Sequence, residues 1–310
     1  MRHIDLPADL FSLAEAREVG LSGKVLARLI RDGVIVRERN GLFMQTGLAE
    51  TSDVLQLHVQ IAHKVIDGLR GAYALGGHTA AAALGIWTPD AWTRAGRPVC
   101  LYALDNVCTE HTTRLHILNA TLGNGELVDV DGRLSVNVIR TSIDLARGRS
   151  LARALIPLDS ALRLGASHDA LEGRVRRMFR WPGVRSVKAA LPHIDHRHES
   201  PLESWSAGRF MLQGIEPPEP QVELRGASGR AYRVDFYWRT ARLVGEADGW
   251  GKFGDDTSLQ ALGFREEKVR EDDLRAAGYR VIRWTFQTQE SAAVAIAQFL
   301  ARQHWRRRAS

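Results

Sequence analysis

The chain has 310 residues, 45% apolar side chains and a net charge of +6 at pH 7. This length allows two or three domains with cores of their own. Two cysteines are too few for a disulfide scaffold. The sequence shows no apolar signal segment, which excludes a secreted precursor, and no apolar run long enough to span a membrane, which excludes a membrane protein. We therefore expect a cytoplasmic protein with no membrane partner, whose basic balance permits DNA as a partner.

Two short helices are predicted near the N-terminus. Ser12 and Glu15 have the spacing of a capping box, and Gly20 can end this first helix in a left-handed conformation. Ser22 then caps a second helix, which ends near Gly33. Residues 34–44 follow as two strand-like segments joined at Asn40–Gly41, a strong signal for a two-residue hairpin turn.

Basic residues recur on one face of the second helix and on one face of the hairpin. A helix that is packed by one side and basic on the other can lie in a major groove of double-stranded DNA. We interpret residues 1–48 as a winged helix-turn-helix; a small packing module with solvated arginines is the alternative. The candidate DNA contacts are Lys24, Arg28, Arg31, Arg37 and Arg39.

The middle of the chain, residues 49–165, mixes helical and strand-like patterns and suggests no catalytic constellation. Residues 134–139 read as a strand within it. Residues 166–196 carry many arginines and are interpreted as a basic helical linker. These arginines either contact the phosphates of a nucleic acid or are simply exposed to solvent. His193, His196 and His198 follow in a loop-like run without a second ligand cluster, which disfavours zinc.

The first half of the chain resembles a known family. Residues 8–48, the small-residue helix within 74–86 and the segment 138–147 are similar to AbiEi-type antitoxin and transcriptional-regulator proteins with a winged helix. The resemblance covers roughly residues 8–165. It implies operator binding and control by a protein partner encoded in the same operon, and it does not imply catalysis.

The C-terminal part, residues 197–310, alternates helices and short strands. A helix between strands indicates a crossover, so we expect a mixed sheet with flanking helices and, for the whole chain, a multidomain α/β protein. The predicted helices are 201–212, 266–277 and 290–304, and the predicted strands are 221–225, 232–238, 242–247 and 279–285.

Acidic residues lie at defined places in this pattern. Glu203 is on the first helix, Asp235 is on a strand, and Glu246 and Asp248 lie two residues apart, on one face of the next strand. Lys252 follows closely. Carboxylates with a nearby lysine are the arrangement that holds Mg²⁺ and positions water for attack on a phosphodiester.

This order of elements and acids resembles the PD-(D/E)XK nuclease fold and, more narrowly, the Vsr-like domains often fused to AbiEi-type winged helices. The resemblance spans roughly residues 197–290. It implies that Asp235 and Glu246, with Glu203, coordinate Mg²⁺ or Mn²⁺. It further implies that Lys252 polarises water and phosphate, and that Arg270 steadies a phosphate.

The match departs from the nuclease pattern at one place, because Glu246-x-Asp248 replaces Glu-x-Lys. Either Lys252 supplies the missing ammonium, or Asp248 is itself a ligand, or catalysis has been lost. The first hypothesis is therefore a metal-dependent DNA endonuclease, a hydrolase acting in phage defence or a toxin–antitoxin setting. The second is a transcription regulator or antitoxin whose nuclease fold only binds DNA or protein, and the third is an interaction protein.

Overall fold

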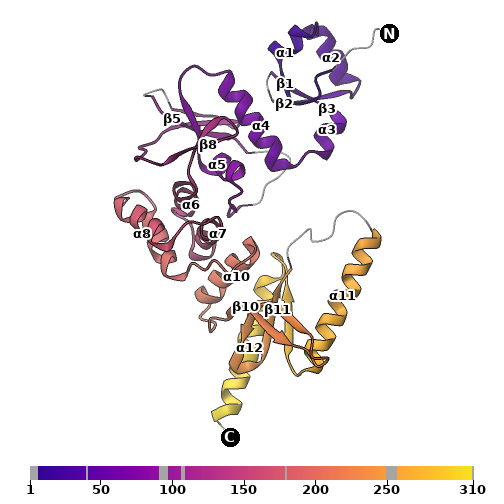
Figure 1. Ribbon diagram of the computed structural model, residues 1–310, viewed down its shortest axis with the longest axis vertical. Helices are drawn as coiled ribbons and strands as arrows, with labels where there is room; N and C mark the ends of the chain where they lie inside the picture. The colour runs from indigo at the N-terminus through magenta and orange to yellow at the C-terminus, as the bar shows by residue number, and fades with distance from the viewer. Residues whose placement is uncertain are drawn as a thin grey trace. The chain divides into compact units, whose positions relative to one another are not determined.

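The computed structural model shows a mixed α/β chain that separates into two compact units (Figure 1). The described residues are 6–39, 41–90, 97–105, 109–178, 180–248 and 257–308, with only the backbone for 257–265 and 304–308. Unit 1 comprises residues 1–86 and 90–141, and unit 2 comprises 87–89 and 142–310. Within these described ranges, no helix has both the length and the apolar character needed to span a bilayer.

Unit 1 begins with a three-stranded sheet in the order β1-β3-β2. The predicted capping box is confirmed, because the Ser12 hydroxyl accepts the Glu15 amide and the Glu15 carboxylate accepts the Ser12 amide. The Ser22 hydroxyl likewise accepts the amide of Val25 and starts the second helix. Asn40 of the predicted turn lies outside the described residues. The elements are β1 (Phe11–Ser12), α1 (Leu13–Glu18), α2 (Gly23–Arg31), β2 (Ile35–Arg39) and β3 (Leu42–Gln45).

A six-stranded sheet in the order β6-β7-β5-β4-β9-β8 forms the larger core of unit 1. One predicted strand is shorter than expected, because Asn137 accepts the amide of Arg140 and so starts helix α6 (Val138–Ala146) directly after β9. The other elements are α3 (Thr46–Thr51), α4 (Val54–Asp67), β4 (Tyr73–Leu75), α5 (Gly77–Leu84), β5 (Val99–Ala103), β6 (Glu110–His111), β7 (Leu115–Asn119), β8 (Leu127–Val130) and β9 (Arg133–Val136).

Unit 2 includes helices that the sequence assigned to a middle region and a linker. These are α7 (Leu151–Arg163), α8 (His168–Arg177) and α9 (Val184–Ala190). Helix α7 packs on α10 (Pro201–Leu212), and the approach requires a glycine, since a Cβ at Gly208 would lie 2.4 Å from the Cα of Ala152. Segment 166–196 is not merely solvated, because Leu171, Val175 and Val187 are buried. The compact unit therefore starts well before residue 197.

The four-stranded sheet of unit 2 has the order β10-β11-β12-β13. Neighbours β10, β11 and β12 pair antiparallel, whereas β13 runs parallel to β12 after the long helix α11. This is the crossover and mixed sheet expected from the sequence. The elements are β10 (Glu219–Arg225), β11 (Ala231–Trp238), β12 (Leu243–Ala247), α11 (Thr257–Ala276), β13 (Arg280–Trp284) and α12 (Gln289–Arg308).

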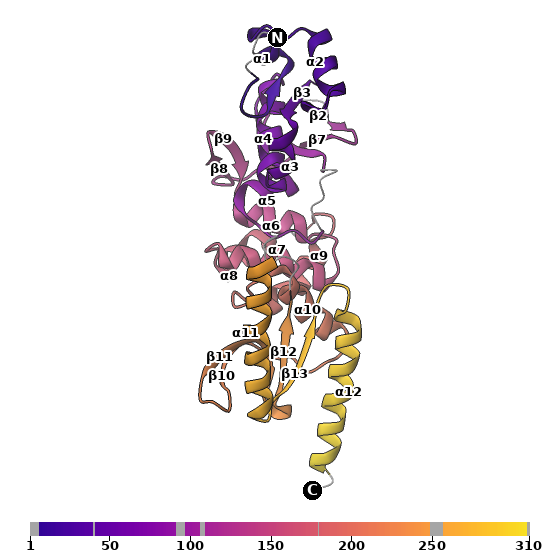
Figure 2. The same cartoon turned by 90° about the vertical axis from the view of Figure 1, so that its right-hand side faces the viewer.

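Helices cover both faces of this sheet. Apolar residues of α10 and α12 pack with Phe236, Trp238 and Trp284 on one face. Leu274 of α11 packs with Val244 on the other face, and Figure 2 shows α11 and α12 on opposite sides of β12 and β13. The strands therefore lie in a middle layer, where a charged side chain is withdrawn from water unless it lies at an end of a strand.

Candidate functional site

The candidate site lies where β11, β12 and the start of α10 come together. Asp235 in β11 connects two of these elements, because its Oδ2 accepts the backbone amide of Ala247, at the end of β12, at 2.8 Å. Pairing of Phe236 with Gly245 holds the two strands in this register. The antiparallel connection thus brings residues about ten positions apart in the sequence to one place.

Glu203 reaches the site from the first turn of α10. Its carboxylate accepts the Ser200 hydroxyl at 2.8 Å and the Glu199 amide at 2.9 Å, while the Ser200 hydroxyl caps the helix. The side chain is buried. Burial, and then the charge of Asp235, raise the pKa of Glu203. Glu203 is therefore held by the residues at the start of its helix and also lies within electrostatic range of Asp235.

Gln221 of β10 bridges these two acids. Its Nε2 donates to Glu203 Oε2 at 2.8 Å and to Asp235 Oδ1 at 3.3 Å. The Gln221 backbone has φ of 55°, in the left-handed region that few residues other than glycine adopt. Sequence reasoning missed this residue. Gln221 lies between Pro220 and Val222, whose partners Phe236 and Val234 flank Asp235, so the signal was the strand pairing and not a motif.

Glu246 is the most strongly perturbed acid of the site. It is only 4% exposed, and Arg270 of α11 donates to its Oε1 at 2.8 Å. Burial, and then the neighbouring charge of Asp235, raise the pKa of Glu246 to about 8, although Arg270 favours the ionised form. A carboxyl group with so high a pKa ionises readily only when additional positive charge approaches it.

Asp248 belongs to a second, adjoining network. The Arg283 guanidinium of β13 holds it with two hydrogen bonds of 2.8 and 2.7 Å, and Arg283 also donates to Glu267 at 2.7 Å. The paired carboxylate of Asp248 raises the pKa of Arg283. Glu267 in turn accepts from Arg270, so two arginines join Glu246, Asp248 and Glu267 in one chain of ion pairs.

The structure thus brings Glu203, Asp235 and Glu246 into one electrostatic cluster, and it places Asp248 in the Arg283 pair. We call Glu203, Asp235 and Glu246 the acid cluster. Arg270, expected on a phosphate, is here bound to Glu246, Glu267 and the carbonyl of Arg233. Lys252 lies outside the described residues.

The acid cluster does not have the spacing of a ready-made metal site. Among side chains that the structure describes, three ligand atoms lie within 4.8 Å of one another only in an exposed group at the start of α8, formed by His168, Asp169 and Glu172. Gln221 and Arg270 provide N–H donors to the cluster instead. The carboxylate oxygens of Glu203, Asp235 and Glu246 are nevertheless the kind of ligand that Mg²⁺ and Mn²⁺ prefer.

A buried histidine–carboxylate pair adjoins this region and was not anticipated. His198 Nδ1 lies 2.8 Å from Asp159 Oδ2, and Asp159 Oδ1 accepts the amide of Asp195 at 2.9 Å. Burial raises the pKa of Asp159. Burial alone would lower the pKa of His198, but the bond to Asp159 and the charges of Asp159 and Asp195 raise it. Because α7 supplies Asp159, no local motif could have indicated the pair.

The candidate DNA contacts of unit 1 differ in their surroundings. Lys24, Arg28 and Arg31 are exposed on α2, and Arg28 pairs with Asp32 at 3.4 Å. Arg37 is exposed and lies over the Phe43 ring. Arg39 instead donates to the backbone carbonyls of Arg97 and Arg114, so its guanidinium ties β2 to the larger sheet.

Comparison with known proteins gives relatives without an assigned activity. No protein-family model matches the chain. It is similar to two uncharacterized proteins of Mycobacterium tuberculosis, from strains CDC 1551 and H37Rv. Each is 29% identical over 210 residues, covering 58% of this chain and 74% of the relative.

Proposed function

We propose that the protein is a metal-dependent DNA endonuclease in which unit 2 cleaves phosphodiesters and the N-terminal part of unit 1 binds double-stranded DNA. The observation that carries the proposal is the convergence of Glu203, Asp235 and Glu246 from α10, β11 and β12, with Glu246 buried and bound by Arg270. Buried carboxyl groups that perturb one another's pKa values cluster at functional sites. The proposed fold of unit 2 is the PD-(D/E)XK type.

Topology supports this proposal. Three antiparallel strands, a crossover helix and a parallel strand bring an acid from α10, one from β11 and one from β12 to the same place. Hydrogen bonds from Ser200 and Gln221 fix the Glu203 carboxylate, those from Gln221 and the Ala247 amide fix Asp235, and Arg270 fixes Glu246. Such positioning from rigid elements is what a catalytic site requires.

We propose that Asp235 and Glu246, with Glu203, hold Mg²⁺ or Mn²⁺. A bound divalent ion would activate water and neutralise charge on the phosphate. Asp235 would be the ligand between the two glutamates, because it lies within electrostatic range of both. Arg270 and Gln221 hold the carboxylates in place before a cation enters, and Arg283 keeps Asp248 beside them.

The proposed DNA-binding surface is the exposed face of α2 with Lys24, Arg28 and Arg31, and the neighbouring Arg37. All four side chains are solvent-exposed, so they are available for phosphates. We propose a winged helix-turn-helix for this part of unit 1, since the hairpin of β2 and β3 follows the two helices and pairs with β1, which precedes them. Arg39 would act indirectly, by fixing β2 through the carbonyls of Arg97 and Arg114.

A second candidate function is a transcriptional regulator or antitoxin whose nuclease fold is inactive. The observation in its favour is that protein groups already satisfy the acids, since Arg270 pairs with Glu246 and Gln221 bridges Glu203 and Asp235. The Glu246-x-Asp248 sequence also departs from the Glu-x-Lys pattern. In this case the acid cluster serves the fold alone, and the protein binds DNA or a partner encoded nearby.

Plasmid cleavage with Mg²⁺ or Mn²⁺ tests the proposal. Wild type should nick or linearise the DNA, and Asp235→Asn and Glu246→Gln should each abolish cleavage. The control is Glu223→Gln, which removes an exposed acid of β10 and should leave cleavage unchanged. Absence of cleavage by wild type with either ion, together with retained DNA binding, would favour the regulator.

Metal binding gives a separate measurement by thermal unfolding. An ion that binds only the folded protein stabilises it by about 2.7 kcal/mol at a hundred times its Kd. Mn²⁺ should raise the wild-type Tm, and Glu246→Gln should lose this rise. Because Glu246→Gln removes a buried carboxyl with a raised pKa, its Tm without metal should equal or exceed that of wild type. A lower Tm without metal would show that the Arg270–Glu246 pair is mainly structural.

A further inference from the structure

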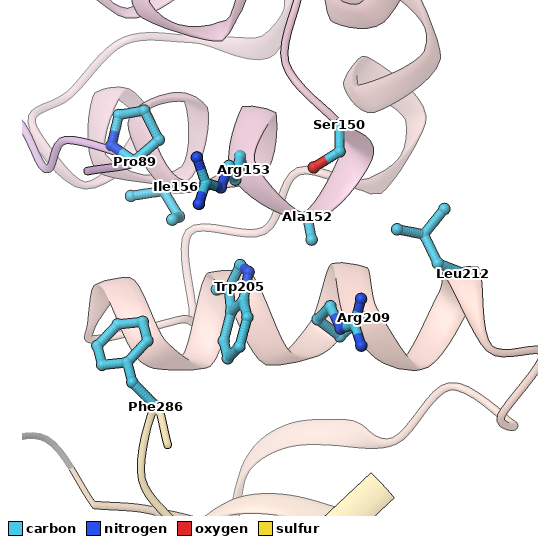
Figure 3. Close-up of a pocket in the computed structure, with 9 residues that line it drawn as sticks. All are labelled: Pro89, Ser150, Ala152, Arg153, Ile156, Trp205, Arg209, Leu212 and Phe286. Atoms are coloured by element: carbon cyan, nitrogen blue, oxygen red, sulfur yellow. The ribbon is translucent and has the colours of Figure 1, made fainter. Parts of the chain in front are cut away.

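A cavity of about 400 Å³ lies within unit 2, between α7 and α10 (Figure 3). The two helices touch where Gly208 lies against Ala152, and the cavity is bordered by this contact and by the segment after β13. This volume is in the range of pockets for small organic ligands. Trp205 and Glu203 are both on α10, but Trp205 lines the cavity whereas Glu203 hydrogen-bonds with Gln221 of the sheet. The cavity is therefore distinct from the acid cluster.

Aromatic groups form one wall of this cavity. The rings of Trp205 and Phe286 lie 5.4 Å apart, and Figure 3 shows Trp205 and Arg209 on α10 with Phe286 beside that helix. Phe286 and Leu212 are 44% and 54% exposed, which is unusual for large apolar side chains. A ligand ring that covered this wall would gain stacking and apolar contact.

Two arginines and a helix start add positive potential to the same cavity. Arg153 enters from α7, and Arg209 lies 5.9 Å from the Trp205 ring centre. Among the residues that the structure describes, the buried Nε of Arg209 has no hydrogen-bond acceptor. Ser150, before the first turn of α7, lines the cavity, and its hydroxyl makes no capping hydrogen bond. Glu290 lies 3.6 Å from Arg209, but it is 81% exposed and offsets little of this charge.

We propose that this cavity binds a nucleotide, with its base against Trp205 and Phe286 and its phosphate held by Arg153, Arg209 and the start of α7. A planar ring joined to an anion is the chemistry that matches an aromatic wall beside two guanidinium groups. The indole and phenyl wall alone would accept many apolar ligands, and the arginines alone many anions. Only a ligand with both groups uses both walls, and a cavity of about 400 Å³ suits one nucleotide.

The same chemistry can be presented by a free nucleotide or by the phosphorylated end of a DNA strand. The inference does not depend on the proposed cleavage, because it concerns binding by other residues. Binding is therefore measured in EDTA, where a metal-dependent reaction does not proceed and failure of one proposal leaves the other untouched.

Calorimetric titration of the full chain with adenosine 5′-monophosphate tests the inference. One site per chain is expected, with adenosine and inorganic phosphate each binding at least about tenfold more weakly, since each uses one wall. Arg209→Gln and Arg153→Gln should each weaken binding about tenfold or more, the typical loss for a charged hydrogen bond. Arg209→Lys keeps the positive charge and should therefore retain part of the affinity. This variant keeps the test decisive if Arg209→Gln disturbs the fold.

Arg163→Gln is the matched control, because Arg163 is also on α7 and also lies over an indole, that of Trp87, but does not line the cavity. Its affinity should remain within about twofold of wild type. No binding at millimolar nucleotide, equal loss in Arg163→Gln, or phosphate binding as tightly as the nucleotide would each overturn the inference. Competition by a 5′-phosphorylated oligonucleotide, but not by its unphosphorylated form, would identify a strand end as the source; lack of competition by both would identify the free nucleotide.

Discussion

The basic face of α2 and the acid cluster of unit 2 are both groups of charged residues, but they differ in their relation to water. Arg28 has 74% of its side chain exposed, whereas the side chain of Glu246 has only 6% exposed. Charges on an exposed helix face cost little to maintain and interact weakly with one another. Buried carboxylates lose hydration, and their protonation changes as a result.

This difference shows how each region can work. The α2 face has its charge available for a polyanion at any neutral pH, and its use depends on salt. The acid cluster requires positive charge from Arg270, from protons or from a cation to offset its burial. Removing an exposed charge should therefore change binding and not stability, and removing a partner of a buried charge should change stability first.

The largest effect is expected at the buried pair of Asp159 and His198. His198→Ala leaves the Asp159 carboxylate buried without its partner, which typically costs about 3–5 kcal/mol. His196→Ala is the control, because that side chain is 75% exposed and should change stability by less than about 0.5 kcal/mol. Urea unfolding of the full chain measures both. Equal free energies of unfolding for His198→Ala and His196→Ala would contradict the expectation that only the buried pair stabilises the fold.

A smaller effect is the pH dependence that the same pair produces. Because the pKa of His198 is raised in the folded protein, folding favours its protonated form. This stabilisation is complete below about pH 6.5 and is lost as the pH rises through the raised pKa, by at most about 1.4 kcal/mol per pH unit. The raised pKa of Asp159 acts in the same direction. The free energy of unfolding of wild type should therefore fall as the pH rises above about 6.5, and a free energy that increases over this range would refute this assignment.

The smallest effect on stability, less than about 0.5 kcal/mol, is expected for Lys24→Gln with Arg28→Gln. The double variant should nevertheless weaken DNA binding and reduce the slope of log K against log salt by about two, roughly 0.9 for each lost phosphate contact. Filter binding at several salt concentrations measures the slope. The control is Glu18→Gln on the neighbouring α1, which should not reduce the slope. An unchanged slope in the folded double variant would remove α2 from the DNA-binding surface.

Several local features of the fold were predictable from the sequence. The bounds of α10 at Pro201 and Leu212 agree with the prediction, since Ser200 caps the helix and proline favours its first turn. The caps at Ser12 and Ser22 were equally clear. The strand predicted to continue past Val136 ended early, because the Asn137 side chain competes for a nearby amide.

The sequence by itself determined the caps of α1, α2 and α10 and the order of helices and strands after residue 200, because caps and periodic patterns depend on residues within one or two turns. That the acid cluster binds a metal stays a prediction. Only the tertiary structure decided that α7 joins unit 2, that Gln221 and Arg270 hold the acid cluster, and that Asp159 pairs with His198. Those contacts join residues 18 to 39 positions apart, and no local propensity encodes which distant partner a buried charge will meet.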